Sequence, residues 1–264
     1  MSKTFLETIV AKTRQRVGRD YDEGIRRAIE KAAISARARA EPHRLRSALS
    51  RRDRINVIAE IKRASPSKGV ISENADPAAI SRFYERGGAA AISVLTEPEY
   101  FLGSLDDLIA VRASVEIPVL RKDFIVDRLQ IAEAAGAGAD AILLIAAALG
   151  ETELVELLRY TEGELQMDAL VEVHTADELT RAIDARAEII GVNNRNLHTL
   201  DVSLDVSRKL IERRPDSLMI AESGIASRGN IQELRGLGFD GFLIGKILMK
   251  SSDPVKELLA LTVL

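Results

Sequence analysis

Short apolar runs alternate with amphipathic segments along most of this chain. Eight runs rich in isoleucine, valine, leucine and alanine predict strands, at residues 55–61, 90–95, 117–120, 141–146, 169–173, 189–193, 218–223 and 241–245. Each run is followed by a segment with apolar residues at helical spacing, at 78–86, 105–113, 129–135, 153–160, 176–185, 204–213, 230–237 and 254–261. Strands that are apolar on both faces are typical of a buried parallel sheet. The pattern therefore predicts an α/β fold in which eight strand–helix units close into a (β/α)8 TIM barrel, with a doubly wound open sheet as the alternative.

The first 52 residues follow a different pattern. They are rich in charge and place apolar residues at helical spacing, which predicts two or three helices before the first strand. A (β/α)8 barrel typically takes about 250 residues, and this chain has 264. We therefore expect a single barrel domain over residues 1–264, with residues 1–52 as its N-terminal helical extension.

Composition narrows the class of protein. Hydrophobic residues make up 46% of the chain and charged residues 29%, enough for a large core under a charged surface. A net charge of −3 argues against binding to a nucleic-acid backbone. The chain has no cysteine, which excludes disulfides and thiolate chemistry. The N-terminus lacks the apolar core of a secretory signal, and no window approaches the roughly 20 apolar residues of a membrane span. We therefore expect a cytoplasmic protein without nucleic-acid or membrane partners.

Charged and polar residues recur where the predicted strands end. In a barrel of this kind the active site lies at those ends, and side chains two apart on a strand, such as Glu60 and Lys62, point to the same face. The set also includes Arg121, Lys122, Asp123, Glu172, Asn193, Asn194, Arg195, Glu222 and Lys246. A charge in a buried strand is costly unless it is paired. The set therefore predicts an active site, with a structural ion-pair network as the alternative.

Glycines after the last two strands suggest a phosphate site. Ser223, Gly224 and Gly245 occupy the place where many barrels bind phosphate through backbone N–H groups, although a glycine there can equally form a tight turn. Lys246 either adds charge to that site or points to solvent. The three histidines (His43, His174 and His198) have no metal-ligand spacing, which predicts surface or loop positions and no metal. The chain also lacks the glycine-rich loops of nucleotide-binding proteins, so no cofactor is expected.

A resemblance covers the whole predicted barrel. The segment 57–69, VIAEIKRASPSKG, closely resembles the signature of the indole-3-glycerol phosphate synthases. The resemblance continues through residues 93–96, 100–104, 120–124, 143–145, 170–173, 192–197 and 221–225. It implies a (β/α)8 lyase of tryptophan biosynthesis, monomeric and without a cofactor. Its phosphorylated small-molecule substrate would be 1-(o-carboxyphenylamino)-1-deoxyribulose 5-phosphate, which is closed, decarboxylated and dehydrated to indole-3-glycerol phosphate.

The resemblance also implies residue roles. Lys122 matches the general acid that protonates the C2′ carbonyl oxygen during ring closure, and Glu172 matches the base that takes the aniline proton. Lys62 matches a residue that binds substrate anions and delivers a proton during dehydration; which lysine acts at which step is left open. The remaining matches bind substrate: Glu60, Ser65, Asn193 and Glu222 its polar groups, Arg195 its carboxylate, Phe101, Phe124 and Leu143 its aromatic ring, and Ser223, Gly224 and Gly245 its phosphate. Lys246 departs from the family's pattern, in which the residue after this last glycine is often small or acidic, and is a further candidate for the phosphate site. Lys68, in the first loop, is a further candidate contact.

The surroundings of Lys122 and Glu172 predict the direction in which the pKa of each is shifted. Like charges at the mouth of the barrel, from Lys62 and Arg195, would lower the pKa of Lys122, and an apolar strand would raise the pKa of Glu172.

The rival functions are an isomerase, such as a phosphoribosylanthranilate isomerase, and a catalytically silent scaffold. The isomerase usually has a cysteine that this chain lacks, and a scaffold would have lost some of the charged strand ends.

Overall fold

The computed structural model describes residues 4–66, 69–73, 75–196 and 199–262. Over these residues, eight parallel strands form a closed barrel: β1 (Asn56–Ile61), β4 (Ala91–Leu95), β5 (Val119–Lys122), β6 (Ala141–Ile145), β7 (Asp168–Val173), β8 (Ile189–Asn193), β9 (Leu218–Glu222) and β10 (Gly241–Ile244). The first strand pairs with both β4 and β10, which closes the ring. The predicted barrel is confirmed, and the open-sheet alternative is wrong.

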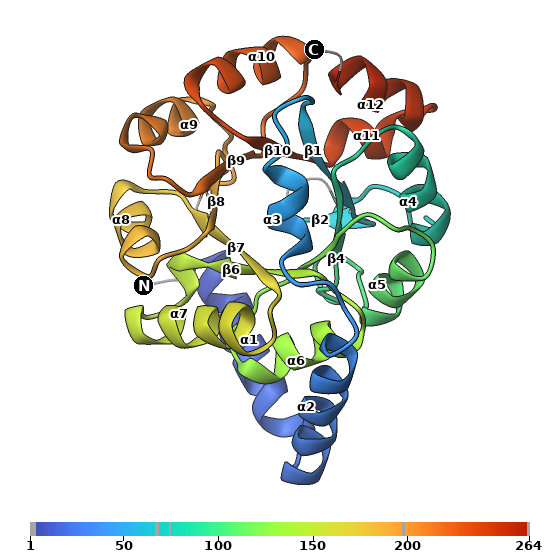
Figure 1. Cartoon of the computed structure of the whole chain (residues 1–264), viewed down its shortest axis with the longest axis vertical. Coiled ribbons are helices and arrows are strands. Elements are labelled where there is room, and N and C mark those ends of the chain that lie inside the picture. The colour runs from blue at the N-terminus through green and yellow to red at the C-terminus, as the bar shows by residue number, and fades with distance from the viewer. Residues whose placement is uncertain (1–3, 67–68, 74, 197–198, 263–264) are drawn as a thin grey trace.

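Helices surround the strands on all sides (Figure 1). They are α4 (Pro77–Arg86), α5 (Leu105–Arg112), α6 (Arg128–Gly136), α7 (Glu151–Leu158), α8 (Ala176–Asp184), α9 (Asp205–Leu210), α10 (Arg228–Leu237) and α12 (Pro254–Thr262). Their starts follow from local chemistry. In α4, for example, Asp76 caps the N–H groups of Ala78 and Ala79, with Pro77 in the first turn.

Several short elements were not predicted. These are the hairpin β2 (Ala64–Ser65) and β3 (Gly69–Val70), the helix α11 (Lys246–Lys250), the 3-10 turns η1 (Ala146–Ala148) and η3 (Ile211–Arg213), and the π-helix η2 (Arg159–Glu164). Each is too short to produce a clear periodic pattern.

The third strand of the barrel, β5, lies further along the chain than predicted. Its range is Val119–Lys122 rather than 117–120. A buried charge, Arg121, is tolerated in this strand because it pairs with Asp123 at 2.9 Å and with Glu133 at 3.3 Å. The strand therefore includes Lys122, which the pleat turns to the opposite face from Arg121.

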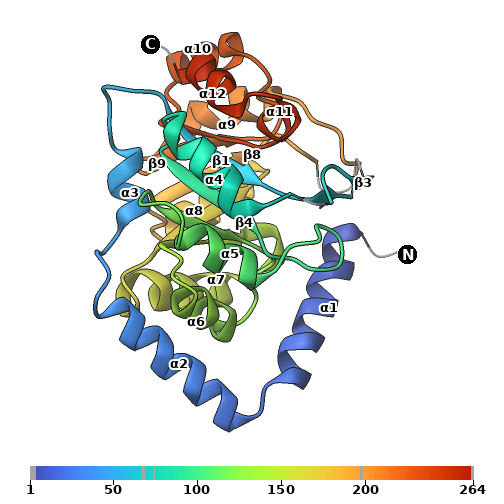
Figure 2. The same cartoon turned by 90° about the vertical axis from the view of Figure 1, so that its right-hand side faces the viewer.

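The N-terminal extension reaches both ends of the barrel. It forms α1 (Phe5–Asp20), α2 (Glu23–Arg37) and α3 (Arg44–Leu49). Figures 1 and 2 show α3 across one end of the barrel, α2 along α6, and α1 near the opposite end, where the β2–β3 hairpin lies. Leu45 and Leu49 of α3 and Ile9 of α1 belong to the same buried cluster as Ile58 inside the barrel. The predicted helical extension is thus confirmed and is packed into the barrel core.

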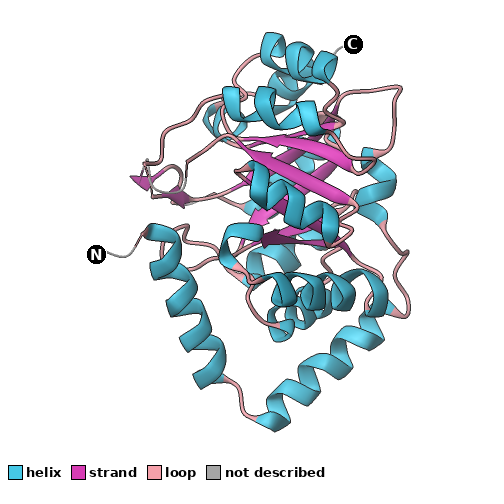
Figure 3. Cartoon of the chain, turned by 90° about the vertical axis from the view of Figure 1, so that its left-hand side faces the viewer, coloured by secondary structure: helices cyan, strands magenta, loops and turns pink. Residues whose placement is uncertain are grey.

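Figure 3 shows the strands on the inside of the barrel and the helices on its outside.

Over the part of the chain that the structure describes, no helix is both long enough and apolar enough to cross a membrane.

The π-helix carries a carboxylate that makes stability depend on pH. Glu162 is mostly buried, and its Oε1 has no hydrogen-bond partner among the described residues. Burial raises the pKa of Glu162 from 4.5 to about 7. The charged form is therefore disfavoured in the folded chain, and stability is lost as pH rises from the unfolded pKa through the folded one.

We therefore expect Glu162→Gln to stabilise the protein at pH 8 by up to about 3 kcal/mol, and by much less near pH 5, where the parent carboxyl is already largely neutral. Thermal unfolding of parent and variant at both pH values checks this. A variant that melts below the parent at pH 8 would contradict it.

Candidate active site

A cavity of about 700 Å³ opens at the carboxyl ends of the strands. It is lined by the residues predicted to take part in catalysis or substrate binding, namely Glu60, Lys62, Ser65, Phe101, Lys122, Phe124, Leu143, Glu172, Asn193, Arg195, Glu222, Ser223, Gly224, Gly245 and Lys246. The fold therefore brings these residues to one place, whereas Arg121 and Asn194, which belong to the same charged and polar strand ends, do not line the cavity. The individual roles of the lining residues in binding and catalysis stay predictions.

Four charged side chains from alternate strands form the floor of this cavity. Glu60 comes from β1, Lys122 from β5, Glu172 from β7 and Glu222 from β9, and these strands alternate around the ring. Barrel interiors are commonly filled by layers of four side chains from alternate strands, usually apolar ones. Here the layer nearest the mouth is charged, so it requires internal pairing in place of hydrophobic packing.

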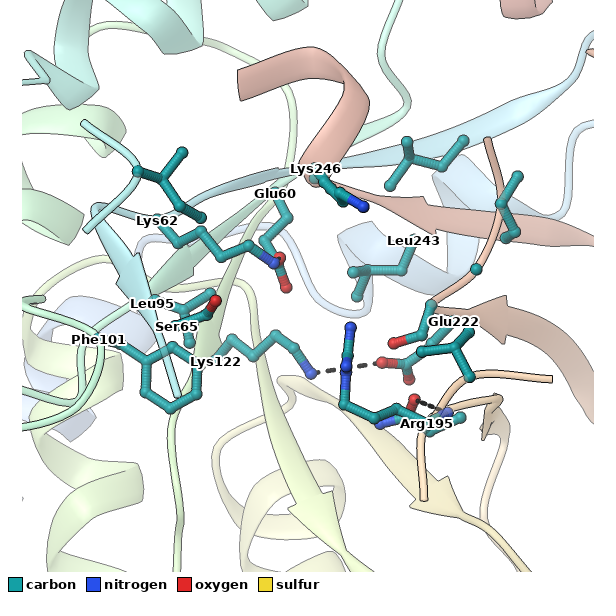
Figure 4. A pocket seen from close by; sticks show the side chains of 18 of the residues that line it. Glu60, Lys62, Ser65, Leu95, Phe101, Lys122, Arg195, Glu222, Leu243 and Lys246 are labelled. Carbon is teal, nitrogen blue, oxygen red and sulfur yellow. Dashed lines mark hydrogen bonds and ion pairs between the residues drawn. The ribbon is translucent and has the colours of Figure 1, made fainter. Parts of the chain in front are cut away.

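Lys122 is the centre of that layer. Its Nζ lies 3.3 Å from Glu172 Oε2 and 3.3 Å from Glu222 Oε2. Both carboxylates are almost fully buried, and the lysine side chain is 14% exposed. Lys62 forms a separate ion pair with Glu60. Figure 4 shows Lys62 and Lys122 extending toward the same central space, with Glu60 and Glu222 across from them.

The electrostatics of Lys122 and Glu172 are the reverse of what the sequence suggested. Burial alone would lower the pKa of Lys122, but Glu222, Glu172 and Glu60 outweigh it and the pKa rises. Burial would raise the pKa of Glu172, but Lys122 and then His174 outweigh it and the pKa falls. Both expectations were wrong because the nearest neighbours of each group carry the opposite charge.

Among the three carboxyl groups of the floor, Glu222 is the one whose pKa is raised. Burial, and then repulsion from Glu172, outweigh the attraction of Lys122 and raise the pKa of Glu222 to about 7. Its Oε1 is buried without a hydrogen-bond partner among the described side chains and backbone groups. The cavity floor at neutral pH therefore combines a charged lysine, two charged glutamates (Glu60 and Glu172) and a third glutamate, Glu222, close to its titration point.

Two further side chains touch Glu172. Asn193 hydrogen-bonds to its carboxylate, while the oxygen of the Asn193 amide accepts the N–H of Arg195 at 3.0 Å. His174 Nε2 lies 3.5 Å from Glu172 Oε1. The sequence had predicted surface or loop positions for the histidines. His174 lies in the loop after β7, as that prediction allows, although its side chain is only 12% exposed.

Two glycines provide room for the carboxylates. A Cβ at Gly191 would come within 2.1 Å of Glu222 Oε1, and one at Gly245 within 2.5 Å of Glu60 Oε1. Gly245 had been singled out only as a phosphate contact. The structure gives it a second physical reason, the close approach of Glu60, and shows that Gly191 matters although the sequence offered no strong signal for it.

We expect Gly191→Ala to push the Glu222 carboxylate away from Lys122, because the added methyl group occupies its place. The variant should lose about 1–3 kcal/mol of stability through overpacking and about tenfold or more in kcat. Urea unfolding and steady-state kinetics measure the two effects. Gly236→Ala in α10, where a Cβ meets nothing within 4 Å, is the matched control, and equal behaviour of the two variants would refute the expectation.

One wall of the cavity is apolar. Phe101 and Phe124 contact each other with ring centroids 6.3 Å apart, beside Leu143. Phe5 of α1 completes this wall, with its ring at 6.3 Å from that of Phe124 and edge-on. Sequence reasoning missed Phe5 because nothing in an N-terminal helix indicates that it reaches the barrel mouth.

The opposite side of the cavity contains the expected phosphate residues. Ser223 and Gly224 both have positive φ, 63° and 79°, a conformation that glycine adopts without strain and serine rarely does. Lys246 lines the cavity while remaining exposed, at the start of the short helix α11. Lys250 also lines it and was not predicted. Lys68 and His198 lie outside the described residues.

Comparisons with known proteins agree with this picture. The family model described as indole-3-glycerol phosphate synthase matches residues 6–261. An indole-3-glycerol phosphate synthase from Carboxydothermus hydrogenoformans is 46% identical over 259 residues, covering 96% of this chain and 98% of that protein. One from Sulfurimonas denitrificans is 54% identical over 202 residues, 76% of each chain.

Solved structures show the same fold at low identity. The 3-hexulose-6-phosphate synthase from Salmonella typhimurium matches with a TM-score of 0.62 and 13% identity, over 78% of this chain and 96% of that one. The thiamine phosphate pyrophosphorylase from Pyrococcus furiosus matches with a TM-score of 0.59 and 18% identity, over 82% and 95%. At such identities the likeness establishes the barrel fold alone.

Proposed function

Because the chain belongs to the indole-3-glycerol phosphate synthase family, and is thereby a carboxy-lyase of tryptophan biosynthesis, we propose that its cavity converts 1-(o-carboxyphenylamino)-1-deoxyribulose 5-phosphate to indole-3-glycerol phosphate, CO2 and water. The observation that carries the proposal for the site is Lys122, held between two buried carboxylates beside an apolar wall. A charged acid, a charged base and a slot for an aromatic ring are what this reaction requires. The family match over residues 6–261 argues against both rival functions, a silent scaffold and an isomerase.

Ring closure requires a proton donor at the C2′ carbonyl oxygen. Lys122 fills that role because its raised pKa keeps it protonated at neutral pH. A high pKa does not prevent donation, since the alkoxide forming on the carbonyl oxygen is more basic than an amine. Loss of the substrate carboxylate as CO2 then returns the electron pair to the ring system.

Dehydration requires a second proton on the same oxygen and removal of the proton from the aniline nitrogen. Lys62, paired with Glu60, supplies the proton on which the hydroxyl leaves as water. Glu172 takes the nitrogen proton as the C–O bond breaks, and its lowered pKa ensures that it is ionised before the step. Lys122 Nζ lies 3.3 Å from Glu172 Oε2, which is close enough for Glu172 to pass this proton on to Lys122. C1′ then loses a proton and the nitrogen regains one, which gives the indole.

The remaining residues bind and orient the substrate. Phe101, Phe124 and Leu143 hold the aromatic ring, and Arg195 binds the substrate carboxylate. Polar groups of the sugar are bound by Ser65, Asn193 and Glu222, while Ser223, Gly224, Gly245 and Lys246 hold the phosphate. On this assignment Lys246 adds charge to the phosphate site.

The experiment is to incubate the purified protein with 1-(o-carboxyphenylamino)-1-deoxyribulose 5-phosphate, without added metal or nucleotide, and to follow indole fluorescence and released CO2. We expect both to appear in equal amounts. The substrate analogue without its phosphate should react far more slowly, because remote binding energy is lost. Absence of both products from a folded protein would overturn the proposal.

A further inference from the structure

Three side chains form a line from the cavity floor toward the barrel surface. His174 Nε2 lies 3.5 Å from Glu172 Oε1, and His174 Nδ1 lies 3.3 Å from Glu178 Oε2. Both flanking carboxylates are largely buried, with exposed fractions of 3% and 16%. The imidazole is therefore enclosed between two carboxylates, one of which belongs to the proposed catalytic set.

Glu178 is fixed by contacts of its own. It lies in the first turn of α8, where its Oε2 accepts the backbone N–H of His174 at 2.7 Å and its own N–H is capped by Thr175 Oγ1 at 3.2 Å. A carboxylate anchored in this way can hold the imidazole from its outer side. The orientation of His174 is thus determined by the start of α8.

The two oxygens of Glu172 face different nitrogen atoms. Its Oε2 faces Lys122 Nζ, and its Oε1 faces His174 Nε2. The other charged or polar groups around it are Glu222, Glu60 and the amide of Asn193. Of these neighbours, Lys122 loses its charge when it donates a proton. The imidazole of His174, when protonated, is then the cation that still faces Glu172.

We propose that His174, held by Glu178, is a positioning residue for Glu172: its imidazolium faces the second oxygen of that carboxylate and keeps it charged and oriented while Lys122 gives up its proton. The proposal rests on the proposed role of Glu172 as base. It assigns a function to a side chain for which the sequence predicted only a surface or loop position.

The charge of the imidazole is consistent with this. Burial would lower the pKa of His174, but the hydrogen bond to Glu178 and the charges of Glu172, Glu178 and Glu222 outweigh it and raise the pKa above 6.5. His174 in turn lowers the pKa of Glu172. Each group of the pair therefore favours the charged form of the other.

The test compares His174→Gln, which keeps a donor of similar reach but no charge, with Glu178→Gln and with His43→Gln. His43 is a matched control, since it also pairs with a buried carboxylate, Asp168, but this carboxylate, unlike Glu172, does not line the cavity. We measure kcat and KM from about pH 9 down to about pH 4, so that the range includes the acid limb on which Glu172 takes up its proton. We expect His174→Gln to lower kcat about tenfold with little change in KM, and to move the acid limb of kcat upward by about one pH unit. Glu178→Gln should give a smaller shift in the same direction, and His43→Gln none.

A second measurement does not depend on activity. The chain has only three histidines, so the His174 ring can be assigned by NMR with labelled histidine and titrated. We expect its pKa to lie above that of a free histidine in the parent, and to fall in Glu172→Gln and in Glu178→Gln.

The outcomes separate this inference from the proposed function. A parent that makes no indole would refute the proposed function, while the NMR titration would still decide the contact between His174 and Glu172. An active parent whose acid limb and kcat are unchanged in His174→Gln would overturn the inference. So would a His174 pKa that is unaffected by Glu172→Gln, or an effect on KM alone, which would indicate a substrate contact instead.

Discussion

Lys122→Met is expected to reduce kcat by about 10²- to 10⁴-fold, the range over which a positioned proton donor contributes. Methionine keeps most of the volume of the side chain, so the cavity floor stays filled. What is lost is the proton for the carbonyl oxygen and the cation between Glu172 and Glu222. Lys209→Met, on the exposed face of α9, is the control for the substitution itself.

The same variant should change how stability depends on pH. Lys122 lowers the pKa of Glu60, Glu172 and Glu222, so its removal raises all three. Carboxyl groups with raised folded pKa values destabilise the fold when ionised, so the variant should lose stability more steeply than the parent as pH rises from about 5 to 8. Thermal unfolding across that range measures the slope. Retained activity, or a slope equal to that of the parent, would show that Lys122 does not have this central position.

Glu172→Gln is expected to have an effect of the same order, about 10²- to 10⁴-fold in kcat, because it replaces the base by a neutral amide of nearly the same shape. Substrate binding should change little, so the loss should appear in kcat with KM within a few-fold of the parent. Steady-state kinetics and a binding measurement with the product separate the two. Glu212→Gln, at an exposed position beyond α9, is the matched control.

The fold of the Glu172→Gln variant should be intact, since Lys122 keeps Glu222 as an ion-pair partner. Removing the Glu172 charge also removes a repulsion that raises the pKa of Glu222. That pKa should fall below about 7, and the parent's loss of stability between about pH 5 and pH 7 from this group should become smaller. A collapse of stability would mean that Glu172 is mainly a structural partner of Lys122, the ion-pair alternative that the sequence left open.

The sequence alone was sufficient for the architecture and for the location of the site. Continuous apolar runs separated by amphipathic segments specify buried parallel strands, and eight of them in this length leave few arrangements. Because all parallel strands end at the same rim, any polar residue at a strand end must lie at that rim. That is why Glu60, Lys122, Glu172 and Glu222 could be placed together before their contacts were known.

The tertiary structure decided what those residues touch, and hence their charge states. The pleat tells which face a side chain occupies but not which side chain meets it across the barrel, and Lys122 meets carboxylates from three other strands. The pKa values of Lys122 and Glu172 therefore ran opposite to the sequence-based expectation. For the same reason, the clearance at Gly191, the reach of Phe5 from the N-terminal helix and the contact of His174 with Glu172 became visible only after closure of the ring had fixed distances between segments far apart in the chain.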